Sequence, residues 1–167
     1  IMGEALEAAF GDPARERYRL NMPAITVGQM TQMVVLRKKM AEGTALPDDI
    51  AALERSGQQR QQALDRAMAE AAQVLVNYRG EKLMLSGMWS ALYQLARLVR
   101  DLGYSGGDFN PDNCIYVGGG LKRAQLPDDY QEFVHETFNI PTNRKFQMYG
   151  MQEINSGMPR CQAGNRY

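Results

Sequence analysis

The chain has 167 residues, of which 44% are hydrophobic and 23% are charged, with 19 basic and 19 acidic side chains. These proportions are typical of a globular protein and argue against a disordered chain, a collagen or a disulfide scaffold. The balanced charge gives no electrostatic reason to expect a nucleic acid or an anionic membrane as partner, and no apolar run approaches the ~20 residues that a membrane-spanning helix needs.

Residues 1–80 are predicted to be a mainly helical segment. A short first helix is indicated by three apolar residues, Leu6, Ala9 and Phe10. A second helix is expected to begin after Thr26, a good N-cap residue, and to end at Gly43. Its apolar residues are three and four positions apart: Val27, Met30, Met33 and Val34.

Two further helical stretches are predicted before residue 80. Pro47 suits the first turn of one of them, and Ser56-Gly57 is expected to break the chain after it. The longest helical pattern follows over residues 58–78. Its apolar stripe consists of Leu64, Ala67, Met68, Ala71 and Leu75.

From residue 81 to 167, short apolar runs alternate with helical patterns. Strands are predicted at residues 82–86, 114–117 and 145–148, with helices over 89–102 and from 127 to 138. Helices between successive strands imply right-handed crossovers and a parallel sheet. The predicted fold is therefore α/β, a partial parallel sheet with crossover helices in residues 80–167, preceded by the helical segment. The predicted domains are 1–80 and 81–167.

Glycines follow the second predicted strand, and an aromatic residue follows the third. Ligands of parallel sheets bind beyond the carboxyl ends of the strands, which places Gly118–Gly120 and Tyr149-Gly150 at the same edge. Three glycines without side chains let a flat ring or a phosphate approach the backbone, although a tight turn without a ligand is the alternative interpretation. The spacing excludes both the dinucleotide-binding and the P-loop signatures.

Two side chains near the third strand could complete a nucleotide site. Tyr149 could stack on a heterocycle held against the glycines. Glu153 could hold Mg²⁺ beside a phosphate, because hard cations prefer carboxylate oxygen. The alternative for Glu153 is a solvated surface carboxylate.

The order strand-GGG, helix, FNIP, strand-YGMQE resembles the adenylate-forming superfamily of acyl- and aryl-CoA synthetases and luciferases. The resemblance covers about residues 80–167 and is closest to the branch of phenylacetate-CoA ligases and acyl-protein synthetases. It implies that the glycines line an adenine pocket, that the aromatic ring stacks on adenine and that the glutamate binds Mg²⁺. The matching residues are Gly118, Gly119, Gly120, Tyr149, Gly150, Met151, Gln152 and Glu153. Gln152 departs from the family, which has a hydroxyl side chain there to contact the α-phosphate.

The resemblance implies an AMP-forming ligase that activates a carboxylic acid with ATP and transfers the acyl group to a thiol of CoA or a carrier protein. The chain begins at Ile1, and the family's phosphate loop, ribose-binding Asp and Lys-bearing C-terminal domain are not found in it. We therefore expect an internal fragment that is inactive alone. The alternatives are a non-enzymatic interaction module built on residues 1–80 and a nucleotide-binding domain without turnover.

Three other residues have open alternatives: Trp89, Lys122 and Cys161. Trp89 is either a core residue or part of the acyl pocket that the resemblance implies, and Lys122 either reaches an anion or is solvated. Cys161 is a buried thiol, an unpaired surface thiol or a metal ligand completed from outside the chain. His135 is expected on the surface, opposite the apolar stripe of its helix. Because two cysteines are too few for a disulfide framework, we expect a cytoplasmic setting.

Overall fold

The structure, a computed structural model, describes residues 11–12, 14, 18–20, 25–121, 124–151 and 156–159. The short helix predicted around Leu6 lies outside the described residues. The chain forms two compact units, residues 19–68 and residues 1–18 with 69–167. The division falls within helix α3 (Pro47–Asn77).

Helix α2 (Val27–Ala41) begins and ends where the sequence predicts. The backbone N–H of Gln29 donates to Oγ1 of Thr26 at 3.2 Å, and the N–H of Thr26 donates to Oε1 of Gln29 at 2.9 Å. This reciprocal pair satisfies two N–H groups that a helix start otherwise leaves free. Gly43 follows the helix with φ of 70°, a backbone conformation that favours glycine.

The predicted break at Ser56-Gly57 is wrong, because α3, 31 residues long in all, continues through both positions without interruption. Pro47 is its first residue, as predicted. A glycine inside a helix costs only about 1 kcal/mol relative to alanine. The neighbours of Gly57 are mainly Arg, Gln and Glu, good helix formers that keep the local preference helical.

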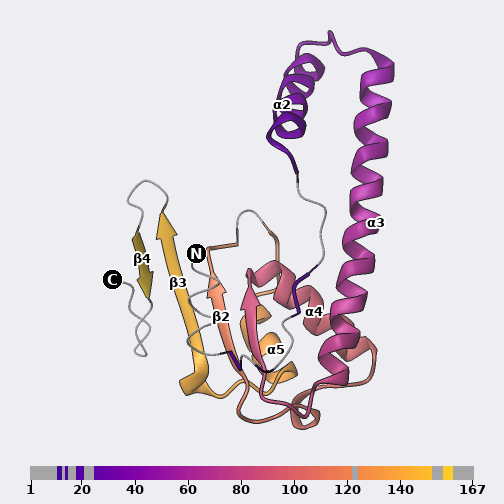
Figure 1. Cartoon of the computed structure of the whole chain (residues 1–167). Coiled ribbons are helices and arrows are strands. Elements are labelled where there is room, and N and C mark those ends of the chain that lie inside the picture. The colour runs from indigo at the N-terminus through magenta and orange to yellow at the C-terminus, as the bar shows by residue number, and fades with distance from the viewer. Residues whose placement is uncertain are drawn as a thin grey trace. The chain divides into compact units, whose positions relative to one another are not determined.

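The second unit contains a four-stranded sheet in the order β1-β2-β3-β4 (Figure 1). Its strands are β1 (Met84–Gly87), β2 (Cys114–Gly118), β3 (Lys145–Met151) and β4 (Ser156–Pro159). The first three strands are parallel, which confirms the predicted α/β class, and β4 is antiparallel to β3. The sequence did not predict β4, and β3 extends beyond its predicted end.

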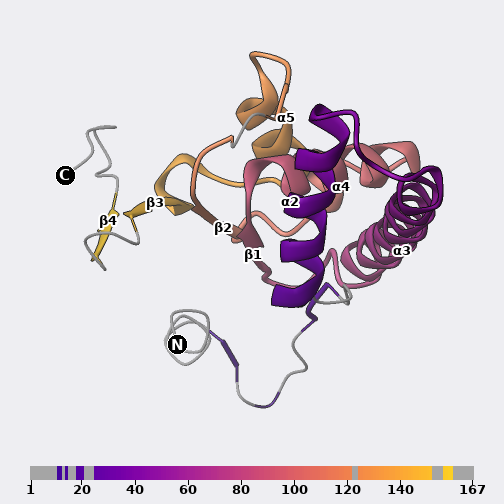
Figure 2. The same ribbon diagram turned by 90° about the horizontal axis from the view of Figure 1, so that it is seen from above.

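Helices α4 (Trp89–Asp101) and α5 (Tyr130–Thr137) connect the parallel strands. Both lie on the same side of the sheet (Figure 2), as right-handed crossovers in the order β1-β2-β3 require. Short 3₁₀ turns at Gly106–Asp108 and Thr142–Arg144 precede β2 and β3. Side chains of α4 and α5 form one buried cluster with strand residues Leu85, Ile115 and Val117.

The other face of the sheet carries the alternate residues of the strands, and we call it the open face. Its side chains are Met84, Ser86, Cys114, Tyr116, Phe146 and Met148, assigned from strand alternation and register. The hydroxyl of Tyr116 lies 3.3 Å from Sδ of Met148, which confirms that these two share a face. None of the six is buried, and Phe146 is 47% exposed.

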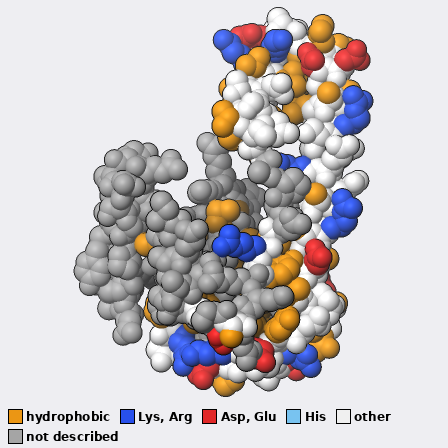
Figure 3. All heavy atoms as spheres, viewed as in Figure 1, with side chains coloured by type: hydrophobic (Ala, Val, Ile, Leu, Met, Phe, Trp, Pro, Cys, Tyr) orange, Lys and Arg blue, Asp and Glu red, His pale blue; other side chains and the backbone are white. Residues whose placement is uncertain are grey.

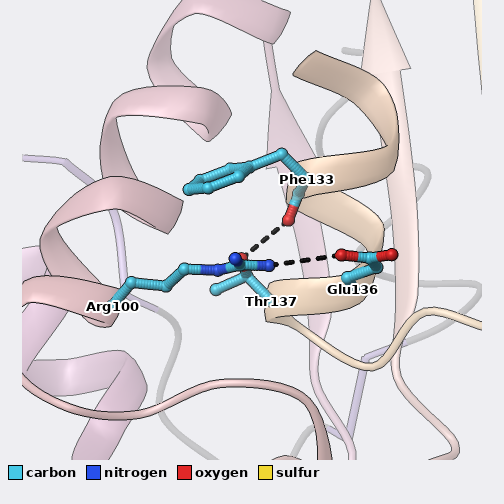
Figure 4. Close-up of polar contacts among 4 residues, drawn as sticks. All are labelled: Arg100, Phe133, Glu136 and Thr137. Atoms are coloured by element: carbon cyan, nitrogen blue, oxygen red, sulfur yellow. Dashed lines mark hydrogen bonds and ion pairs between the residues drawn. The ribbon is translucent and has the colours of Figure 1, made fainter. Parts of the chain in front are cut away.

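Arg100 joins α4 to α5 (Figure 4). Its Nε donates to Oγ1 of Thr137 at 2.7 Å, and its guanidinium carbon lies 4.0 Å from the centre of the Phe133 ring. The hydroxyl of Thr137 in turn donates to the carbonyl oxygen of Phe133 at 2.7 Å. A longer ion pair, at 3.5 Å, reaches Glu136. These contacts fix the register between the two helices.

Asn113 is fully buried just before β2 and joins three parts of the fold. Its Oδ1 accepts from the backbone N–H of Leu83 at 2.7 Å, ahead of β1. Its Nδ2 donates to the carbonyl oxygen of Phe138 at 3.0 Å, just after α5. The amide therefore aligns the starts of β1 and β2 with the end of α5.

Candidate functional site

The carboxyl ends of the parallel strands meet at one edge of the sheet. The pair Gly118 and Met148 is the last in the register between β2 and β3. The backbone N–H of Gly119 then donates to the carbonyl oxygen of Met148 at 3.3 Å. The glycine turn therefore lies beside the backbone of β3 one residue before Tyr149, which is the arrangement that the sequence predicts for this edge.

Beyond Met148, β3 continues without β2. Tyr149, Gly150 and Met151 pair on their other side with β4. Within the described part of the chain, their backbone has no strand partner on the side of the glycines, because the register with β2 has ended. Backbone N–H and C=O groups on that side are thus placed at the edge where a ligand could pair with them.

The fold requires glycine at only one of the three positions. Gly119 has φ of 73°, which side chains of L-residues rarely adopt. Gly118 and Gly120 have ordinary φ values, and a Cβ atom built on either would meet no atom of the described chain within 4 Å. A glycine in a strand destabilises the strand, and no neighbouring atom requires residue 118 to lack a side chain. Both residues leave open space above the backbone.

Helix α4 begins at the same edge. It starts one residue after Met88, which follows β1 directly, and Gly87 lies beside Val117 in the register. Met88 gives no side-chain cap, so the first N–H groups of α4 are not satisfied by a capping side chain. The N-terminus of a helix has a partial positive charge and attracts anions. The helix over 89–102 was predicted from the sequence, but its start was not predicted as part of the site, although a helix that follows a strand after Gly87-Met88 could have indicated it.

Trp89 lies in the core, with 4% of its surface exposed. Its ring meets the rings of Tyr130 and His135 edge to face, with centroid distances of 5.3 and 5.7 Å. Its indole Nε1 has no hydrogen-bond partner among the described residues. The burial agrees with the packing interpretation of Trp89, and a place in an acyl pocket stays a prediction.

The surface position expected for His135 is wrong. Its imidazole is half-buried beside Trp89 because α5 turns this side chain toward the start of α4. Burial, with a smaller contribution from the charge of Lys145, lowers the pKa of His135 from 6.5 to about 4. His135 is therefore neutral at pH 7 and supports the packing of α5 on α4.

Two ionisable groups of the open face are protonated at neutral pH. Burial raises the pKa of the Tyr116 phenol, which leaves its hydroxyl a donor. Partial burial also raises the pKa of the Cys114 thiol, against smaller lowering effects of Lys82 and Arg144. Neither group is a ready base or nucleophile at pH 7.

Several predicted site residues lie outside the described residues: Lys122, Gln152, Glu153 and Cys161. The side chains of Tyr149 and Met151 are likewise not described, so only their backbone is placed. Among the residues that are described, no three His, Cys, Asp or Glu side chains form a group that could hold a metal ion. Of the predicted metal ligands, Glu153 has the oxygen chemistry that Mg²⁺ prefers.

No protein-family model matches the chain, and neither curated proteins nor solved structures give a significant match. Among the helices of the described ranges, none is both long enough and apolar enough to cross a bilayer.

Proposed function

We propose that the chain is part of an adenylate-forming carboxylate ligase and that its sheet edge binds the adenosine of ATP and AMP. The observation that carries this proposal is the open space at Gly118 and Gly120 beside the backbone of Tyr149. Glycines that the fold does not need are explained if a flat ring must approach the backbone there. We take this ring to be adenine because the resemblance to the superfamily implies an adenine pocket at these glycines.

In this proposal the edge recognises adenosine through the backbone and one aromatic ring. The adenine lies against Gly118–Gly120 and pairs with free backbone groups of β3. The phenol of Tyr149 stacks on its other side, an arrangement whose loss by alanine substitution costs about 1–3 kcal/mol per base. The start of α4 adds a partial positive charge for the phosphates.

The reaction follows from the resemblance and has two steps. A carboxylate oxygen of the acid attacks the α-phosphorus of ATP, the bond to the β,γ-phosphates breaks, and acyl-AMP and pyrophosphate form. A thiolate of CoA or of a carrier protein then attacks the acyl carbon, and AMP leaves. Glu153 is proposed to hold Mg²⁺, which neutralises phosphate charge when bound. A cytoplasmic location belongs to the same proposal.

Gln152 bears on whether the site turns over ATP. Its side-chain amide can donate to the α-phosphate, but it is longer than the hydroxyl residue of the family. A single measurement, the exchange of pyrophosphate into ATP, therefore distinguishes a nucleotide-binding domain without turnover from a ligase. If the function is that of a ligase, the full-length parent exchanges labelled pyrophosphate into ATP when a carboxylic acid is present, whereas a parent that only binds nucleotide binds AMP and shows no exchange.

Calorimetric titration of the chain with AMP and with MgATP tests the site. Tyr149→Ala is expected to weaken AMP binding about tenfold or more, while the control Tyr78→Ala, at an exposed tyrosine, leaves it unchanged. Glu153→Ala is expected to remove the gain in ATP affinity that Mg²⁺ gives and to leave AMP binding intact. Unchanged affinities in both Tyr149→Ala and Glu153→Ala would refute the proposal.

A second candidate, the non-enzymatic interaction module, is favoured by the surface of the helical unit. No residue of α2 is buried, and hydrophobic side chains are visible on the molecular surface (Figure 3). The exposed apolar residues of α2 are Val27, Met30, Val34, Val35 and Met40. Exposed apolar side chains that lie together on a surface are typical of an interaction site, and Val27, Met30 and Val34 fall on one side of the helix. If it mediates self-association, sedimentation analysis will show an oligomer that Val34→Glu dissociates, with Thr31→Glu as the control.

A further inference from the structure

Helix α2 and the first part of α3 lack a core of their own. Within the described residues 25–66 no side chain is buried, although α2 alone is 15 residues long. Isolated helices of up to about 15 residues are only marginally stable in water, and in proteins most of the stability of a helix comes from packing. Helix α2 therefore needs a packing partner beyond the contacts that the described chain provides.

One side of α2 has the spacing of a coiled-coil seam. Val27, Met30, Val34, Arg37 and Ala41 follow one another at alternating steps of three and four residues. All five side chains are exposed, and the exposed fractions of Val27, Met30 and Val34 are 75%, 48% and 68%. A helix of 15 residues is about 22 Å long and holds about two heptads of such a seam. This pattern is typical of a surface that packs against another helix, and we call it the α2 seam.

The charges of α2 indicate which helix fits this seam. Arg37, Lys38 and Lys39 are all basic, whereas residues 27–36 contain no charged side chain. A parallel pair of α2 helices would place Arg37 against the partner's Arg37 within the seam, and like charges at this distance repel. In an antiparallel pair, the basic half of each helix lies beside the uncharged half of the other. The charge pattern of α2 therefore fits a second copy of the same helix in the antiparallel orientation.

We propose that two copies of the chain associate through an antiparallel pair of α2 helices. Met30 of each copy packs beside the partner's Val34 at the centre of the contact. Arg37 then lies at the end of the contact beside the partner's Val27, where the guanidinium reaches water while its apolar stem covers the valine. The proposal rests on the second candidate function, because it names the partner of that surface, and it is independent of the proposed nucleotide site.

Sedimentation equilibrium of the full chain over a range of concentrations tests the pairing. The parent chain is expected to form a dimer in reversible equilibrium with the monomer. Val34→Glu places a charge at the centre of the seam and is expected to weaken dimerisation at least about a hundredfold. Gln32→Glu adds the same charge on the opposite, exposed side of α2 and is expected to change dimerisation less than about threefold. The emission of Trp89, the single tryptophan, shows whether each variant keeps the core of the other unit.

Disulfide trapping tests the orientation, in a background in which both native cysteines are replaced by serine. Under mild oxidation, a mixture of Met30→Cys and Val34→Cys copies is expected to form the mixed disulfide. Copies of Val27→Cys are expected to crosslink with one another much more slowly, because the antiparallel arrangement places the two residues at opposite ends of the contact.

The outcomes separate this proposal from the two candidate functions. A chain that stays monomeric, or a dimer that Val34→Glu does not weaken, would overturn the pairing of α2 helices. A dimer that Val34→Glu weakens, but in which Val27→Cys crosslinks as fast as the mixed pair, would overturn the antiparallel arrangement and leave the interaction role of α2 in place. Titration with AMP reports on the ligase proposal independently of all these results.

Discussion

Two neighbouring glycines allow the reasoning about the sheet edge to be tested with the same chemical change. Gly119→Ala places a methyl group on a residue with φ of 73° and is expected to destabilise the fold by about 1–2 kcal/mol. Gly118→Ala places it in open space on a strand and is expected to stabilise the fold by about 0.5–1 kcal/mol, because alanine loses less chain entropy than glycine. The stabilities of the two variants should therefore differ by about 1.5–3 kcal/mol, with changes of opposite sign relative to the parent chain.

Urea unfolding followed by the emission of Trp89 measures both values, since this ring is buried in the core of the same unit. The functional half of the prediction uses Gly118→Val, which suits a strand but fills the space above it. We expect this variant to keep or gain stability and to lose AMP affinity at least tenfold. A loss of stability in Gly118→Ala equal to that in Gly119→Ala would refute the structural reasoning. Undiminished AMP binding by Gly118→Val would show that the open space does not receive the ligand.

Three further predictions concern the packing behind this edge. Asn113→Ala leaves the part-buried N–H of Leu83 and the buried C=O of Phe138 unpaired and should cost about 2–4 kcal/mol in urea unfolding, with the exposed Asn77→Ala as control. Because the fold lowers the pKa of His135 from 6.5 to about 4, the neutral imidazole contributes fully to stability above pH 6.5, and this contribution is lost as the pH falls through about 4. The emission of Trp89, whose ring contacts the imidazole, should titrate with a midpoint near 4. A midpoint near 6.5 would contradict the burial of the imidazole. Arg100→Ala should cost about 1–2 kcal/mol, whereas Glu136→Gln should cost less than about 0.5 kcal/mol because its carboxylate is 64% exposed and its ion pair is long.

The strands and crossover helices of the second half could be predicted because each element has its own local signal. The apolar run that forms β2 is bounded on both sides by turn residues. Helix α4 has a strong apolar stripe that ends before Gly103, and the φ of 89° at this glycine closes the helix. Helices between successive strands then leave few topologies open. The parallel order followed from these signals without any knowledge of contacts.

Other features depended on contacts that one sequence does not reveal. β4 contains Gly157 and Pro159, both poor strand formers, and it exists through pairing with β3. His135 was assigned to the surface from its place opposite a stripe, but the short helix α5 buries more than one side against α4. Ser56-Gly57 was interpreted as a break because glycine often ends helices, whereas the surrounding helix formers outweigh it.

For the candidate site, the sequence predicted that the ends of β2 and β3 share an edge, and the backbone of Tyr149 lies next to the glycine turn there. It could not separate Gly119, which the turn needs, from Gly118 and Gly120, which the described fold does not need. That distinction depends on dihedral angles and on the space around each Cβ. It is also the distinction on which the proposed function depends most.

The bridge made by Asn113 has a consequence for how this half of the molecule folds. One side chain joins backbone groups 30 residues away on one side and 25 on the other. Neither Leu83 nor Phe138 can form its hydrogen bond to Asn113 until segments far apart in the sequence have met. The entropic cost of closing these long loops therefore comes before the stabilisation that the bonds provide. The amides of β1 and those around Phe138 should therefore exchange hydrogen with deuterium at a common slow rate, as one cooperative unit rather than as independent supersecondary pieces.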